Sequence, residues 1–205
     1  FSSFFLIFLL LPPRCFLGPI TGGAIYTKSS EDYYFREFFF PILYKITKII
    51  FLFRYKKLLF STELLKKEIS KKIYKKCEFN FIIKGIKKNK KIKKKYNFLF
   101  YFRKHKNKKN QNLIKFINFL VRKKIDVMLV GNKLKIRGVK NLGFIKHEKL
   151  ISYLSQTRYS LVSDENIFSL FTIDAINNNV QLLIDKKKFK FTNQFRKNFI
   201  KFNFK

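Results

Sequence analysis

Acid, amide and hydroxyl side chains gather in a short segment of the C-terminal half, between two apolar runs. Ser163–Asn166 reads SDEN, and Ser169 and Asp174 follow it. The SDEN run is a cluster of helix-capping residue types, so it predicts a helix that starts near Asn166. A carboxylate at such a helix entrance lies where phosphates and ribose hydroxyls bind in parallel α/β sheets. Glu165 is therefore a candidate binding residue; the alternative is that the acids only cap the helix or face the solvent.

A second candidate group is the basic loop that follows the apolar run Asn97–Phe102. It begins with Arg103 and contains Lys108 among several other lysines. A guanidinium can donate to two phosphate oxygens at once, whereas an ammonium acts as a movable point charge, so the pair suits a diphosphate. The neighbouring lysines leave open which ammonium binds, and a solvated charge cluster is the alternative.

Strands and helices that alternate along residues 96–205 must position these side chains. Short apolar runs bounded by polar loops predict buried parallel strands, with amphipathic helices between them on both faces. The carboxyl ends near Arg103, Gly131 and Glu165 are expected to converge on one crevice. The predicted strands are Phe98–Tyr101, Val127–Val130, Tyr159–Val162 and Gln181–Ile184.

The segment between these blocks predicts one more strand and helix. Val139–Ile145 reads as a short strand, and His147–Leu154 as an amphipathic helix. We interpret His147 and Glu148 as the start of that helix rather than as a proton-transfer site, since such a pair is common at helix starts.

Together these blocks resemble the nucleotide-sugar half of retaining GT-B glycosyltransferases. In that family the first strand of the domain ends in an Arg followed by a Lys, which bind the diphosphate, and Arg103 and Lys108 match them. A Glu, seven residues and a second Glu hold the donor sugar and the ribose. Glu165 matches the first acid, whereas Asp174 stands one place later than the second. The resemblance implies catalytic roles for Arg103, Lys108 and Glu165, and donor binding by Asn166, Ser169, Asp174 and Gly131.

A third and weaker match lies in Phe16–Gly23, which reads FLGPITGG. Many GT-B enzymes carry a Gly-Pro and a Gly pair late in the acceptor-binding domain. Gly18, Gly22 and Gly23 are predicted to form a loop that places backbone amides in a cleft, and an ordinary tight turn is the alternative. The elements expected next are an aromatic and basic amphipathic stretch at Tyr34–Phe53, a strand at Lys57–Ser61 and a helix from Thr62.

The predicted organisation is α/β and GT-B-like, with two Rossmann-type domains. Residues 1–83 are the C-terminal part of the acceptor-binding domain, 84–95 a linker with eight lysines in twelve residues, and 96–205 the nucleotide-sugar-binding domain. A two-domain enzyme of this kind needs roughly 350 residues or more, and this chain has 205 and starts at Phe1. We therefore expect an N-terminally truncated fragment.

A formal net charge of +34 and a pI near 10.3 would ordinarily indicate nucleic acid as a partner. The abundance of Lys, Asn, Ile, Phe and Tyr is also typical of an AT-rich genome. A basic nucleic-acid-binding or ribosome-associated protein stays open as the alternative to a glycosyltransferase, as does a non-catalytic remnant. The excess charge also favours peripheral contact with anionic lipid.

The sequence offers no metal site. Cys15 and Cys77 have no paired spacing, His105 and His147 are the only histidines, and phosphate-loop and Gly-x-Ser-x-Gly motifs are missing. We expect no metal, and no cofactor beyond the nucleotide-diphosphate sugar donor. The expected acceptor is a glycan or a lipid-linked molecule.

Two unpaired cysteines fit a reducing cytoplasm. Contact with the inner face of the membrane is expected to be peripheral, and no specific nucleic acid is expected.

Overall fold

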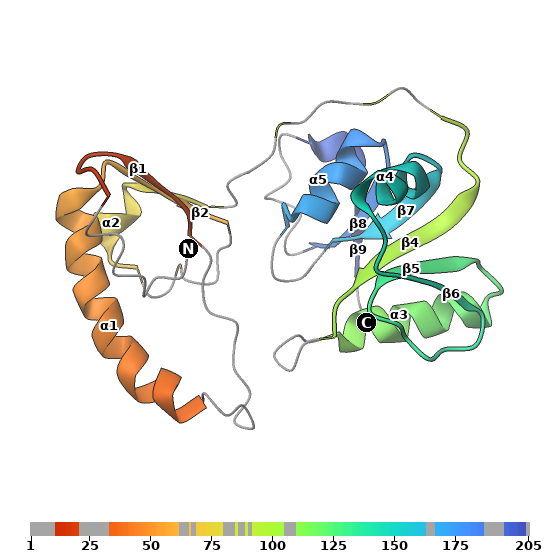
Figure 1. Cartoon of the computed structure of the whole chain (residues 1–205), viewed down its shortest axis with the longest axis horizontal. Helices are drawn as coiled ribbons and strands as arrows, with labels where there is room; N and C mark the ends of the chain where they lie inside the picture. The colour runs from red at the N-terminus through yellow and green to blue at the C-terminus, as the bar shows by residue number, and fades with distance from the viewer. Residues whose placement is uncertain are drawn as a thin grey trace. The chain divides into compact units, whose positions relative to one another are not determined.

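The computed structural model of the chain describes residues 11–20, 33–61, 66, 69–79, 85, 89, 92–104, 110–162, 167–186 and 195–203. The chain divides into two compact units, each with its own parallel sheet. Unit 1 comprises Phe1–Ile83 and Glu165–Phe168, and unit 2 comprises Lys84–Asp164 and Ser169–Lys205. The α/β class with parallel sheets is therefore confirmed (Figure 1).

Unit 2 is built on a six-stranded sheet in which every neighbouring pair of strands is parallel. The spatial order is β6-β5-β4-β7-β8-β9. If the strands of this unit are numbered along the chain from β4 as 1 to β9 as 6, the spatial order is 3-2-1-4-5-6. This is the strand order of Rossmann-type nucleotide-binding sheets. The strands are β4 (Tyr96–Phe102), β5 (Val127–Gly131), β6 (Val139–Gly143), β7 (Thr157–Leu161), β8 (Gln181–Asp185) and β9 (Phe199–Phe202).

The sequence predicted all of these strands except β9. That strand is four residues long, and only Phe199 within it is buried, so its apolar pattern is weak. It forms because β8 offers an open edge, to which Phe199 pairs opposite Leu182. The Phe202 ring also packs 5.1 Å from that of Phe116, which fixes the end of the strand over the core.

Helices cover both faces of this sheet, as predicted (Figure 1). Helix α3 (Gln111–Arg122) buries Phe116, Ile117 and Leu120 in one cluster with Phe100 and Phe102 of β4. The periodicity of the sequence predicted this face, since these residues recur at helical spacing. Helices α4 (His147–Ser155) and α5 (Leu170–Asn177) lie on the opposite side from α3.

Unit 1 has a three-stranded parallel sheet in the order β1-β2-β3. Its buried core contains Leu17, Ile20, Phe51, Tyr55, Leu58, Phe60 and Ile73. The sequence predicted β2 and the amphipathic stretch that forms α1, but not α2 or β3. The elements are β1 (Phe16–Ile20), α1 (Tyr33–Arg54), β2 (Lys57–Phe60), α2 (Lys71–Tyr74) and β3 (Cys77–Phe79).

Gly18 lies in a strand, so the prediction of a loop is wrong for Phe16–Ile20. A Cβ at Gly18 would stand 2.5 Å from the Cβ of Leu59 in the neighbouring strand. Glycine is needed here because two backbones approach closely, not because a turn requires it. Gly22, Gly23 and the helix expected from Thr62 lie outside the described residues.

The described part of the Lys-rich segment is attached to unit 2. The backbone N–H of Asn89 donates to the Asn177 carbonyl over 2.7 Å. The ammonium of Lys94 donates to the carbonyls of Ser155 (3.0 Å) and Asn178 (2.8 Å), at the ends of α4 and α5. Burial lowers the pKa of Lys94, while a cation at two helix ends is electrostatically favourable. Asn89 and Lys94 of the predicted linker therefore make defined contacts with unit 2. The assignment of the acceptor to unit 1 and of the donor to unit 2 stays a prediction.

Candidate functional site

The strand order of unit 2 reverses between β4 and β7. On one side β4 pairs with β5 as far as Phe102 and Gly131, whereas on the other it pairs with β7 only as far as Phe98 and Tyr159. The β4–β7 ladder therefore ends before the carboxyl ends of the strands. In open parallel sheets, ligands bind outside the carboxyl ends at such a point of reversal.

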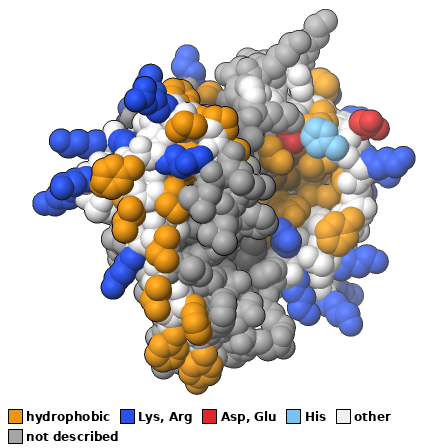
Figure 2. Space-filling view, turned by 60° about the vertical axis from the view of Figure 1, so that its left-hand side comes forward, with side chains coloured by type: hydrophobic (Ala, Val, Ile, Leu, Met, Phe, Trp, Pro, Cys, Tyr) orange, Lys and Arg blue, Asp and Glu red, His pale blue; other side chains and the backbone are white. Residues whose placement is uncertain are grey.

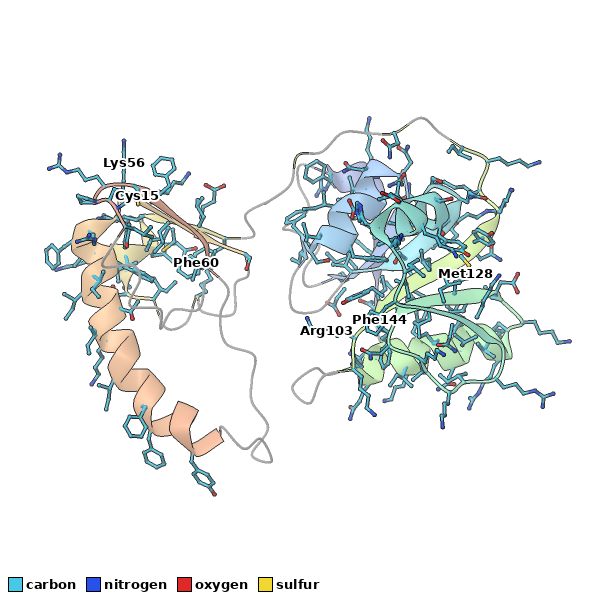
Figure 3. All side chains as sticks on the ribbon, viewed as in Figure 1. Cys15, Lys56, Phe60, Arg103, Met128 and Phe144 are labelled. Carbon is cyan, nitrogen blue, oxygen red and sulfur yellow. The ribbon has the colours of Figure 1, made fainter. Side chains whose placement is uncertain are left out.

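Arg103 is the first residue after β4, at this edge of the sheet (Figure 3). Its carbonyl accepts a hydrogen bond from the Asn110 side-chain amide (3.0 Å), and the N–H of Lys104 donates to the Asn132 side-chain oxygen (2.9 Å). The backbone is thus held on both sides of an exposed guanidinium. That guanidinium forms no ion pair with any residue that the structure describes. An exposed guanidinium on a backbone held in this way is suited to an anionic ligand.

Gly131 ends β5 with a φ of +102°, beside the carboxyl end of β4. A Cβ at this position would lie 2.3 Å from the carbonyl oxygen of Phe102. The N–H of Asn132 donates to that same oxygen over 2.8 Å. Asn132 therefore joins β5 to the loop that carries Arg103, a role that the sequence prediction missed; the Gly-Asn pair after a buried strand was the available signal.

The predicted start of the donor-side helix is wrong. Ile167 and Phe168 form a turn, and α5 begins at Leu170 rather than near Asn166. Ser169 is the N-cap, with extended backbone angles (φ −60°, ψ 157°), and its Oγ accepts from the N–H of Thr172 over 3.2 Å. The cap is therefore Ser169, three residues beyond Asn166, and no member of the SDEN run. The predicted residues Glu165, Asn166 and Lys108 lie outside the described part of the chain.

Ser169→Ala is expected to lower the free energy of unfolding by about 1 kcal/mol, because the Thr172 N–H loses its acceptor. Urea denaturation of the full chain followed by circular dichroism would measure this change. Ser169→Asp should restore most of the loss, since a carboxylate caps equally well and interacts favourably with the positive helix end. Equal stability of the alanine and parental chains would contradict the cap.

Asp174 is 3% exposed, so it does not face the solvent. Its Oδ2 lies 2.9 Å from Nε2 of His147, which stands 27 residues earlier in the chain. His147 begins α4, as predicted, but its ring also reaches across to the middle of α5. The carboxylate that the sequence assigned to a ribose is therefore already hydrogen-bonded. Sequence reasoning missed this pair because the two residues stand 27 positions apart, on different helices.

Stacked rings join the first turn of α5 to the carboxyl half of β4. Tyr101 and Phe171 have ring centroids 5.8 Å apart and planes inclined by 28°. Tyr101 is still 44% exposed. This contact fixes the start of α5 next to β4, the strand that Arg103 follows, so the same strand positions Arg103 and the start of α5.

Cys77 is a free thiol that belongs to unit 1 rather than to this sheet. Burial raises the pKa of the Cys77 thiol in unit 1 to about 11, which makes it a poor nucleophile at neutral pH. Within the described ranges, no three His, Cys, Asp or Glu side chains are placed to hold a metal ion together. No model of a protein family matches the chain, and no curated protein matches it either.

Proposed function

We propose that the chain is part of a retaining GT-B glycosyltransferase, which transfers a sugar from a nucleotide-diphosphate donor to a glycan or lipid-linked acceptor. The observation that carries this proposal is the place of Arg103 at the reversal point of a 3-2-1-4-5-6 parallel sheet. The segment that resembles the donor signature follows β7, the strand on the other side of that point. Arg103 and the carboxyl end of β7 thus lie on the two sides of the point at which such folds bind nucleotides, which supports the proposal.

In this mechanism the charge that develops on the departing diphosphate is neutralised by Arg103 together with Lys108. Arg103 is suited to this role because its backbone is held by Asn110 and by the Lys104–Asn132 hydrogen bond. A donor that is fixed before the reaction stabilises the transition state without reorganisation. The start of α5, with its capped N-terminus at Ser169, adds a positive dipole end on the other side.

Recognition of the ribose and the donor sugar falls to the segment from Glu165 to Asp174. In the resembled signature the two acids stand eight positions apart. Asn166 stands at that distance before Asp174, whereas Glu165 stands one position further away. The Asp174 carboxylate would share its hydrogen bonds between His147 and a ribose hydroxyl. The His147 side chain is 60% exposed, so the ring can move without disturbing the core.

The test of the proposal is direct titration of the full chain with uridine and guanosine diphosphates and with their sugar conjugates. Saturable binding of one nucleotide series, with a preference for one base, would support a donor site. The alternative, a basic nucleic-acid-binding protein, predicts no such saturation. It predicts RNA binding that falls steeply as salt is raised, because phosphate contacts release counterions.

Glu165→Gln separates the two functions, because they demand opposite outcomes. If Glu165 orients the donor sugar, release of nucleotide diphosphate from the sugar conjugate should fall by about tenfold or more, since the amide keeps the size but loses the charge. Asp126→Asn, which removes an exposed carboxylate just before β5, should leave the rate unchanged. A nucleic-acid-binding protein should instead bind RNA equally or more tightly after the loss of one negative charge. Release at the parental rate, together with sustained RNA binding at moderate salt, would overturn the glycosyltransferase proposal.

A further inference from the structure

Helix α1 of unit 1 exposes a row of large apolar side chains. They stand at intervals of 4, 4, 3 and 4 residues, which places them on one face of an α-helix. At 1.5 Å per residue the row is about 22 Å long. This apolar stripe consists of Phe38 (68% exposed), Ile42 (58%), Ile46 (50%), Ile49 (61%) and Phe53 (80%).

The opposite side of α1 supplies the contacts that hold the helix to unit 1. Phe51 and Thr47 are 6% and 8% exposed, and Phe51 belongs to the buried core with Leu58 and Phe60. The helix therefore has two apolar sides, of which the fold of unit 1 uses one. Folded proteins seldom expose contiguous apolar surface of this extent without a binding role.

Among the charged side chains of α1 that the structure describes, the exposed one is Lys45. Lys45 lies three residues after Ile42 and four before Ile49, so it borders the stripe on the helix. Glu78 is the exposed acid among the unit 1 side chains that the structure describes, and it is paired with Lys57. The exposed basic residues of the described part of unit 1 are Arg14, Lys45, Lys56, Lys66, Lys71, Lys72 and Lys75.

Figure 2, in which the side that carries α1 comes forward, shows hydrophobic side chains in orange following one another, with Lys and Arg side chains in blue toward the upper end of the row and along its left side. An apolar row with cations beside it is complementary to a layer of acyl chains beneath anionic headgroups. The described part of the chain has no helix long and apolar enough to cross a membrane. A helix with such an apolar row and a cation beside it can lie in the plane of a membrane surface.

We propose that unit 1 docks on an anionic membrane surface through α1, with the apolar stripe inserted between lipids and the neighbouring lysines at their phosphates. The stripe supplies burial of apolar area, and each basic residue near the surface adds about 1 kcal/mol of electrostatic attraction. This inference stands independently of the proposed sugar transfer, although a membrane surface would give access to a lipid-linked acceptor.

The experiment is flotation of the full chain with vesicles of phosphatidylcholine alone or mixed with phosphatidylglycerol, at moderate salt. The parental chain should float with the mixed vesicles and not with the neutral ones. The double substitution Ile42→Ser and Ile49→Ser should lower the bound fraction by about fivefold or more, because both residues lose their insertion into lipid. The matched control is Ile92→Ser with Ile200→Ser, which changes two exposed isoleucines of unit 2 and should float like the parent.

Two results would overturn the proposal. If both double variants float equally well with anionic vesicles, the net charge alone causes adsorption and the stripe has no part in it. If vesicles do not bind, and light scattering instead shows a dimer that Ile42→Ser with Ile49→Ser dissociates, the stripe contacts a second copy of the chain. Nucleotide titration of the stripe variant separates this test from the proposed function, since a donor site in unit 2 should bind nucleotide unchanged.

Discussion

Gly131→Ala is expected to lower the free energy of unfolding of unit 2 by about 3 kcal/mol or more. A side chain at φ +102° is strained by about 1 to 3 kcal/mol. The new Cβ would also lie 2.3 Å from the Phe102 carbonyl oxygen, so β4 and β5 would have to separate at the sheet edge, which adds a similar cost. Urea denaturation of the full chain, followed by circular dichroism, would measure the loss.

Gly143→Ala is the matched control, because an alanine there would have the backbone strain of a positive φ without a close contact at its Cβ. Gly143 ends β6 with a φ of +70°, and apart from its two chain neighbours no residue has a heavy atom within 4 Å of the Cβ that alanine would add. The expected cost is therefore about 1 to 2 kcal/mol. Equal losses for the two substitutions would show that the close approach of Gly131 to β4 contributes nothing.

Arg103→Ala should weaken nucleotide-diphosphate binding by about ten- to a hundredfold, since hydrogen bonds to charged groups contribute about 1.5 to 3 kcal/mol. The reason is that the guanidinium stands on a backbone fixed by two side-chain hydrogen bonds, at the reversal point of the sheet. Isothermal titration calorimetry with uridine and guanosine diphosphates would measure the change. The circular dichroism spectrum should be unchanged, because the side chain is exposed.

Arg158→Ala provides the control for charge. Arg158 is also exposed, but it is the second residue of β7 and so belongs to the amino-end half of the same sheet. Loss of this guanidinium removes the same formal charge without touching the proposed site, and screening at moderate salt makes its remote effect small. If both variants weaken nucleotide binding equally, Arg103 acts only through the net charge and is not part of a site.

The sequence was sufficient to predict that unit 2 is a parallel α/β sheet and to locate its strands other than β9. Its central strands are apolar runs that end in polar loops, so the pattern is local and direct; β5, for example, is buried at every position. Helix α3 was equally predictable, because Phe116, Ile117 and Leu120 recur on one face. These elements are specified by residues within one window of sequence, which is what periodicity can detect.

The features that the sequence did not reveal depend on contacts between distant residues. Strand β9 exists because β8 has a free edge, and the His147–Asp174 hydrogen bond exists because α4 and α5 pack together. Gly18 was assigned to a loop, since a glycine in a strand and a glycine in a turn look alike until the neighbouring strand is known. The helix start near Asn166 was misplaced because adjacent capping residue types compete, and packing decides between them.

The anchoring of Lys94 has a consequence for how the lysine-rich run tolerates substitution. A single third-base change converts a lysine codon to an asparagine codon, so drift in an AT-rich gene exchanges these two residues freely. At the exposed Lys93 and Lys95 such an exchange removes only a solvated charge. At Lys94 the shorter amide would no longer reach the carbonyls of both Ser155 and Asn178. Selection should therefore preserve one lysine in a stretch whose neighbours are replaceable, although composition alone makes all of them look equivalent.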